Sequence, residues 1–230
     1  MKKDKVIVAL DVDNYSDAEK IVKELKGVIN IFKVGKQLFT KEGPRVIKMV
    51  HEHGCKVFLD LKYHDIPNTV SQAAKAAADL GVFMFNVHIE GGVRMMQECA
   101  AALKEIKNKP YVLGITVLTS IDQITMNQEL NVLGSVEEEV VRRAELAKKA
   151  GLDGVVASPH EILAIRKACG QNFMIVTPGV RPEWSKKDDQ ERVDTPKDAI
   201  LAGADYIVVG RPIIKAPNRL EAAKRLIKEL

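Results

Sequence analysis

One strand–helix unit of this chain lies in the stretch KVFLDLKYHDIPNTVSQAAKAAADLG, residues 56–81. Its first part, Val57–Leu61, is a short apolar run, which is typical of a buried strand. Its second part, Thr69–Leu80, has helical periodicity and is followed by Gly81, a residue type that is common just after a helix. The stretch therefore predicts a strand, a polar connection and a helix, in that order.

The same alternation of short apolar runs and helical stretches continues along the whole chain. Eight strands are expected, at Val6–Leu10, Ile31–Val34, Val57–Leu61, Met84–His88, Val112–Val117, Gly154–Ala157, Met174–Thr177 and Tyr206–Val209. Eight helices are expected after them, at Ser16–Lys26, Pro44–His53, Thr69–Leu80, Val93–Ile106, Val136–Ala150, Pro159–Ala168, Pro196–Ala202 and Arg219–Leu230. Strands that alternate with helices predict an α/β fold with a parallel sheet.

Eight such units can close into a barrel or lie open as a doubly wound sheet. The first strand is followed by Asp11-Val-Asp-Asn-Tyr15 and not by the Gly-rich fingerprint of dinucleotide-binding sheets. The units are also evenly spaced. We therefore expect a (β/α)8 TIM barrel, formed by one domain over residues 1–230.

Composition limits the classes of function. The chain has a net charge of +4 and only 5% aromatic residues, without the basic and aromatic cluster of a nucleic-acid binder. The apolar runs are too short to span a bilayer, and no signal peptide is visible. Three widely spaced cysteines fit a reducing compartment better than a disulfide framework. We expect a cytoplasmic protein that binds neither nucleic acid nor membrane.

Catalytic groups of a barrel enzyme lie at the C-terminal ends of its strands. Asp60 and Lys62 end the third predicted strand, and alternation directs both to the same face. Asp11 and Lys33 end the two preceding strands and are expected to pair with them. A structural ion-pair network would also account for any one of these residues, but four on one rim favour a functional site. A lysine between aspartates stays protonated, which suits a proton donor.

A phosphate site is expected where barrels often have one, in the connections after the seventh and eighth strands. These connections contain Gly179 with Arg181 and Gly210 with Arg211. Glycine allows close approach of an anion to the backbone, and arginine supplies a planar set of donors. Gln190, in the long connection Gly179–Thr195, is expected to add an amide donor.

The run FLDLKYHDIPNT, residues 58–69, resembles the signature of the orotidine 5′-monophosphate decarboxylase family. The family pattern of Asp, Lys and Asp at relative positions one, three and six is met by Asp60, Lys62 and Asp65. The resemblance covers essentially the whole chain. It includes Ala9-Leu-Asp11, Phe32-Lys-Val-Gly35, Thr116-Val-Leu-Thr-Ser120, Thr177-Pro-Gly-Val-Arg181 and Val209-Gly-Arg-Pro212.

The resemblance implies decarboxylation of orotidine 5′-monophosphate to uridine 5′-monophosphate, without a metal or other cofactor. Lys62 would protonate C6 of the pyrimidine within the array Lys33, Asp60, Lys62 and Asp65. Substrate contacts are implied for Asp11 and Lys33 at the ribose, for Thr119 and Ser120 at the pyrimidine, for Arg181, Gln190, Gly210 and Arg211 at the phosphate, and for Asp60, Asp65, Ile66 and Thr69. Asp65 and Thr69 would reach the partner's site in a homodimer.

Two alternatives stay open. Related sugar-phosphate decarboxylases and hexulose-phosphate synthases share the Asp-x-Lys-x-x-Asp run but use magnesium. Thr119 and the long seventh connection with Arg181 and Gln190 favour the nucleotide enzyme. The other alternative is a non-catalytic barrel that binds a nucleotide, which has no need for Lys62.

Overall fold

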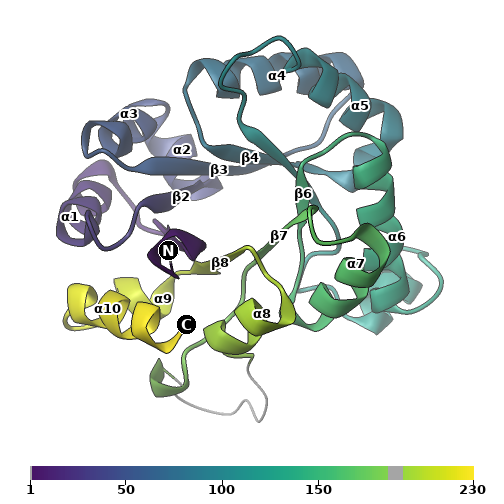
Figure 1. The fold of residues 1–230 in the computed structure, drawn as a ribbon. Helices are drawn as coiled ribbons and strands as arrows, with labels where there is room; N and C mark the ends of the chain where they lie inside the picture. Colours follow the sequence, from purple (N-terminus) through teal and green to yellow (C-terminus); the bar gives the residue numbers. More distant parts are fainter. Residues whose placement is uncertain (1, 186–193) are drawn as a thin grey trace.

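The computed structural model describes residues 2–185 and 194–230. Eight parallel strands form a closed barrel in sequence order, and the major helices lie outside it (Figure 1). The strands are β1 (Val6–Ala9), β2 (Ile31–Gly35), β3 (Lys56–Tyr63), β4 (Met84–His88), β5 (Tyr111–Ile115), β6 (Gly154–Val156), β7 (Met174–Thr177) and β8 (Tyr206–Val209). The predicted (β/α)8 barrel is confirmed.

The α-helices follow the strands. They are α1 (Tyr15–Leu25), α2 (Lys36–Glu42), α3 (Arg45–Glu52), α4 (Pro67–Asp79), α5 (Gly92–Ala102), α6 (Val136–Lys149), α7 (Ile162–Cys169), α8 (Pro196–Ala202), α9 (Arg211–Ile214) and α10 (Arg219–Glu229). Shorter helical turns are η1 (Lys2–Lys5), η2 (Ile89–Gly91), η3 (Thr125–Glu129), η4 (Pro159–Glu161) and η5 (Glu183–Ser185). No helix in the described ranges is long and apolar enough to cross a membrane.

Several predicted boundaries were wrong. Helices α2 and α9 were not expected, because each is too short for a periodic apolar pattern to stand out. Helix α4 begins two residues before the expected Thr69, at Pro67, since proline has no N–H to leave unpaired at a helix start. Strand β3 continues beyond the expected Leu61 to Tyr63, which pairs with β4 after a register shift.

Two apolar layers hold the barrel together. The inner layer fills the barrel and consists of Ile7, Ala9, Ile31, Phe58, Met84, Leu113, Val176 and Val208. The outer layer lies between strands and helices and is larger. Because the C-terminal ends of parallel strands meet at one end of a barrel, side chains in or just after the last residues of β1, β2, β3 and β8 come together there.

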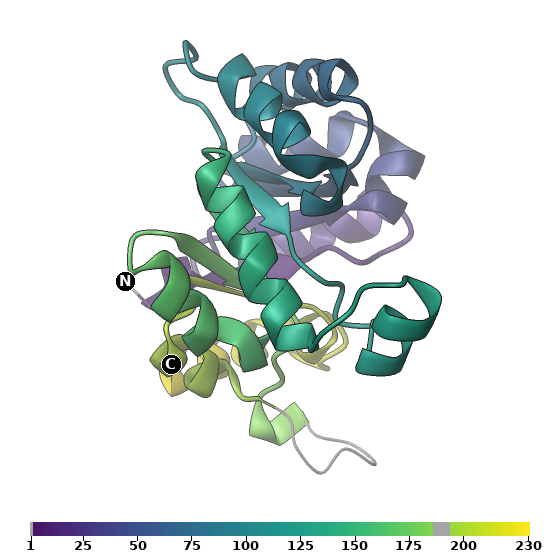
Figure 2. The ribbon, with the colours of Figure 1, turned by 90° about the vertical axis from the view of Figure 1, so that its right-hand side faces the viewer.

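The connection between β5 and α6 extends away from the barrel body beside the start of α6 (Figure 2). Residues 118–135 lie between the predicted strand Val112–Val117 and the predicted helix Val136–Ala150, and the structure shows the π-helical turn η3 among them. Helix α6 begins with a capping box, in which Ser135 and Glu138 each accept a hydrogen bond from the other's backbone N–H. The far end of this connection is therefore fixed to the helix.

Candidate active site

Four charged side chains from three neighbouring strand ends form a continuous array. The Lys62 ammonium lies 2.5 Å from Oδ1 of Asp60, and the Lys33 ammonium lies 3.3 Å from Oδ2 of the same carboxylate. Lys33 also donates to Asp11 at 3.1 Å. The charges therefore alternate along the array, and Asp60 is shared by two ammonium groups. Leu61, between Asp60 and Lys62, packs against the outer apolar layer.

The backbone at Lys62 has φ of 54°, a left-handed conformation that side chains other than glycine rarely adopt. Such a conformation costs about 1–3 kcal/mol and persists only where neighbours hold it. Here the Lys62 N–H donates to Oδ1 of Asn86 at 2.8 Å, and Nδ2 of Asn86 donates to Asp60 at 2.8 Å. One amide thus positions both the lysine backbone and the aspartate side chain.

Asn86 was missed by the sequence reasoning. It lies in the middle of β4, and only 1% of its surface is exposed. The signal was present, because a buried polar side chain in an apolar strand must find partners. Those partners come from β3, and the pairing of β3 with β4 is not visible in the sequence.

The electrostatic balance at Asp60 favours the carboxylate. Burial alone would raise the pKa of Asp60, but attraction to Lys33 and Lys62 and the hydrogen bond from Asn86 outweigh it. The pKa of Asp60 is therefore lowered from its usual value. A negative charge is present at the centre of the array at neutral pH.

The array lies in a cavity of about 370 Å³ at the C-terminal end of the barrel. This volume is within the range of small-molecule sites. The wall contains the apolar residues Ile115, Val117, Leu118, Val156, Val180 and Val208. Its polar groups are Asp11, Lys33, Asp60, Lys62, Asn86, Thr119, Arg181 and Arg211, with the backbone of Gly179 and Gly210. The structure thus brings most of the predicted site residues together.

The arginine side of the cavity is formed by the connections after β7 and β8. Gly179 has φ of 83°, so a residue with a Cβ would be strained there. The N–H of Arg181 donates to the carbonyl oxygen of Asp194 at 3.2 Å, which joins the two ends of the connection after β7. Arg181 and Arg211 therefore supply two guanidinium groups to a cavity whose other side contains Lys33 and Lys62.

Turn η5, in the same connection, is attached to the C-terminal helix. Nε1 of Trp184 donates to Glu229 at 3.0 Å, and the guanidinium of Arg225 lies 5.1 Å from the centroid of the indole ring. These contacts fix the start of the connection against α10. Trp184 thus stabilises the segment that directly follows Arg181.

Some predicted site residues do not line this cavity within one chain. Asp65 and Ile66 lie in a separate shallow depression with His64, Pro67, Glu90 and Gly91. Thr69 is exposed on α4, and Ser120 is exposed after Thr119. Gln190 lies outside the described residues. Within residues 2–185 and 194–230, no group of three or more His, Cys, Asp and Glu side chains is arranged to hold a metal ion.

The sequence of this chain is similar to those of one protein family along almost its whole length. A model of the orotidine 5′-phosphate decarboxylase / HUMPS family matches residues 4–226. The orotidine 5′-phosphate decarboxylase of Syntrophotalea carbinolica is 52% identical over 98% of this chain and 94% of its own. The orotidine 5′-phosphate decarboxylase of Geotalea daltonii is 52% identical over 98% and 95%.

Solved structures agree with these sequence relatives. The orotidine 5′-phosphate decarboxylase of Lactobacillus acidophilus superposes with a TM-score of 0.87 at 39% identity, covering 98% of each chain. That of Pyrococcus horikoshii superposes with a TM-score of 0.77 at 30% identity, covering 97% of this chain and 98% of its own. The chain described here therefore belongs to the orotidine 5′-phosphate decarboxylase / HUMPS family.

Proposed function

We propose that this chain decarboxylates orotidine 5′-monophosphate to uridine 5′-monophosphate in pyrimidine biosynthesis, on one domain that spans residues 1–230. The observation that carries the proposal is the position of the Lys62–Asp60–Lys33–Asp11 array in a cavity that also contains Arg181 and Arg211. The family match and the names of the relatives at about half identity support it.

The array suggests how the reaction proceeds. The bond between C6 and the carboxylate breaks, carbon dioxide leaves, and the electron pair remains on C6. The Lys62 ammonium then donates a proton to C6, and the neutral lysine regains a proton from water. Asp60 holds the ammonium 2.5 Å from its Oδ1 and places negative charge near the departing carboxylate. Lys33 offsets part of that charge from the other side.

The rest of the cavity is assigned to the nucleotide. Arg181, Gly210 and Arg211 hold the phosphate together with Gln190, since guanidinium groups and glycine backbone suit an anion. Asp11 and Lys33 contact the ribose hydroxyls. Thr119 contacts the pyrimidine, with Ser120 beside it. No cofactor is required, because the proton donor belongs to the protein.

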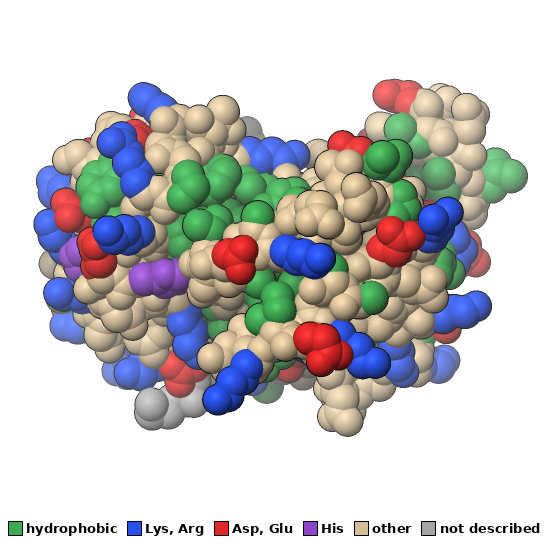
Figure 3. All heavy atoms as spheres, turned by 90° about the horizontal axis from the view of Figure 1, so that it is seen from above, with side chains coloured by type: hydrophobic (Ala, Val, Ile, Leu, Met, Phe, Trp, Pro, Cys, Tyr) green, Lys and Arg blue, Asp and Glu red, His purple; other side chains and the backbone are tan. Residues whose placement is uncertain are grey.

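The active unit is proposed to be a homodimer in the cytoplasm. Asp65, Ile66 and Thr69 are exposed outside the cavity of their own chain, and Ile66 is 67% exposed. Hydrophobic side chains also gather between charged ones on the face where α4 and α5 lie (Figure 3). We propose that Asp65, Ile66 and Thr69 complete the site of a second copy.

The dimer proposal is tested by mixing two inactive variants, Lys62→Ala and Asp65→Ala. Each mixed dimer would contain one intact site, so random exchange should restore about a quarter of wild-type activity. No recovery after verified subunit exchange would show that Asp65 does not serve the partner's site.

The function is tested by an ultraviolet assay of orotidine 5′-monophosphate conversion with excess chelator. We expect the same rate of turnover with and without chelator. Loss of turnover with chelator would favour the metal-using sugar-phosphate enzymes. Binding of uridine 5′-monophosphate without release of carbon dioxide would instead indicate a non-catalytic barrel.

A further inference from the structure

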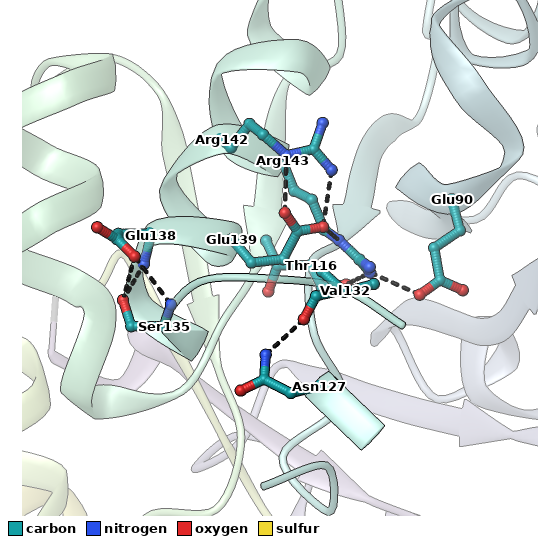
Figure 4. A network of polar contacts seen from close by, with 9 residues as sticks. All are labelled: Glu90, Thr116, Asn127, Val132, Ser135, Glu138, Glu139, Arg142 and Arg143. Atoms are coloured by element: carbon teal, nitrogen blue, oxygen red, sulfur yellow. Dashed lines mark hydrogen bonds and ion pairs between the residues drawn. The ribbon is translucent and has the colours of Figure 1, made fainter. Parts of the chain in front are cut away.

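A buried polar network lies between α6 and the barrel rim, outside the cavity (Figure 4). Its centre is Arg143, whose side chain is only 7% exposed. Nε of Arg143 donates to Glu139 at 2.6 Å, one turn earlier on the same helix. Nη1 donates to the carbonyl oxygen of Thr116 at 2.6 Å and to Glu90 at 2.7 Å. One guanidinium therefore joins α6, the end of β5 and the turn after β4.

Thr116 is the first residue of the connection that leaves β5 at the cavity. It directly follows β5, and its hydroxyl donates to the carbonyl oxygen of Val156 on β6 at 2.9 Å. Its own carbonyl accepts from Arg143, and the residue is 1% exposed. The next three residues, 117–119, line the cavity. The orientation of the Thr116 peptide therefore sets the direction in which residues 117–119 leave the strand.

The contact with Arg143 is energetically important because it is buried. A buried carbonyl without a donor is costly, and a hydrogen bond from a charged donor is stronger than a neutral one. Glu139 and Glu90 balance the charge of the guanidinium. The other end of the β5–α6 connection is already fixed by Ser135 at the start of α6. Arg143 fixes the near end to the same helix.

We propose that Arg143 is a positioning residue of the candidate active site, which holds residues 117–119 so that Thr119 faces the base of the nucleotide. This inference rests on the proposed function, since that function places the pyrimidine against Thr119. Arg143 itself does not touch the cavity; it acts through the Thr116 carbonyl. The substrate feature that it serves is the base and not the phosphate.

Arg142 provides a matched control on the same helix. Its Nε and Nη2 donate to the two carboxylate oxygens of Glu139, each at 2.7 Å, and its side chain is 60% exposed. In the described part of the chain, the hydrogen bonds of Arg142 go to Glu139 alone. Replacing Arg142 removes a positive charge from the network without releasing Thr116.

The test compares two ligands by titration calorimetry. Uridine 5′-monophosphate has both base and phosphate, whereas ribose 5-phosphate lacks the base. For Arg143→Met we expect about tenfold weaker binding of uridine 5′-monophosphate, with ribose 5-phosphate changed less than about threefold. Arg143→Lys should recover part of the loss, and Arg142→Met should change neither affinity by more than about twofold.

Equal weakening of both ligands by Arg143→Met, or no weakening of either, would overturn the proposal. Equal affinity of the wild-type protein for both ligands would also overturn the proposal, because residues 117–119 would then not recognise the base. If Arg143→Met does not fold, Glu90→Gln and Arg143→Lys provide the same comparison of affinities. Wild-type protein that binds uridine 5′-monophosphate without turnover would refute the proposed function, while the ratio of affinities would still decide the role of Arg143.

Discussion

The substitution Asn86→Ala tests how the array is held. Asn86 accepts from the Lys62 N–H and donates to Asp60, each at 2.8 Å, and it is almost fully buried. Alanine at this position removes both hydrogen bonds but leaves the side chains of Asp60 and Lys62 themselves unchanged. The variant therefore separates the positioning of Lys62 from its chemistry.

The expected magnitude follows from the two lost contacts. A hydrogen bond to a charged acceptor such as Asp60 contributes about 1.5–3 kcal/mol, and leaving the Lys62 N–H unpaired costs about 1–3 kcal/mol. We expect the free energy of unfolding to fall by about 3 kcal/mol. The left-handed conformation of Lys62 also loses its main support. The Lys62 ammonium is then held less well at the position from which it donates its proton. If this raises the activation free energy by about 1.5–3 kcal/mol, kcat falls roughly 10- to 100-fold.

The assay combines urea unfolding, kcat from the ultraviolet assay, and the pH dependence of stability. The pKa of Asp60 is lowered in the folded protein, so its contribution to stability is present above about pH 4 and is lost as the pH falls through the folded pKa. Without the bond from Asn86, the folded pKa moves back towards the unfolded value. Acid unfolding of Asn86→Ala should therefore begin at a higher pH.

Two further variants show whether the effect of Asn86→Ala comes from its contacts with Lys62 and Asp60. Asn172→Ala removes an exposed asparagine and should change stability by less than about 0.5 kcal/mol. Asn86→Asp keeps an acceptor for the Lys62 N–H but places a second carboxylate beside Asp60. We expect that variant to be less stable at neutral pH than at pH values where the new carboxyl is protonated. If Asn86→Ala retains wild-type kcat and its free energy of unfolding stays within about 0.5 kcal/mol of wild type, Asn86 does not hold the array.

Three further predictions concern the cavity and the core. Lys62→Ala should lose nearly all turnover while its circular dichroism shows that the fold is intact, and near-normal turnover would exclude Lys62 as the proton donor. Arg211→Ala should raise KM for orotidine 5′-monophosphate by about tenfold or more and lower kcat less, since phosphate binding can also support chemistry at a distance; unchanged kinetics would exclude a phosphate role. Burial raises the pKa of Cys99 to about 12, so a thiol reagent at about pH 8 should label it only after unfolding, as measured by peptide mass spectrometry. Rapid labelling of Cys99 in the folded protein would contradict that burial.

Much of the architecture could be predicted from local pattern. All eight strands and eight of the α-helices were expected, because apolar periodicity distinguishes the two element types within each segment. The two α-helices that were missed, Lys36–Glu42 and Arg211–Ile214, are short. They follow β2 and β8, and neither is long enough to show a periodic apolar pattern.

Part of the site was also predictable. Asp11, Lys33, Asp60 and Lys62 were expected at one rim, because the strand ends of a barrel converge there. The array found in the structure agrees with that placement. Asn86 was not found, because nothing local indicates which partner a buried amide on β4 will have.

The sequence by itself determined the order of strands and helices and which charged residues lie near the C-terminal ends of the strands, because apolar periodicity is a property of each segment alone. Only the tertiary structure decided how the Lys62 backbone is held and how the connection that begins at Thr116 is oriented. The register shift between β3 and β4 brings the Lys62 N–H to Asn86, and the packing of α6 brings Arg143 to the Thr116 carbonyl. The partners in these contacts are 24 and 27 residues apart in the sequence, so the contacts form only when neighbouring strands and helices have packed together.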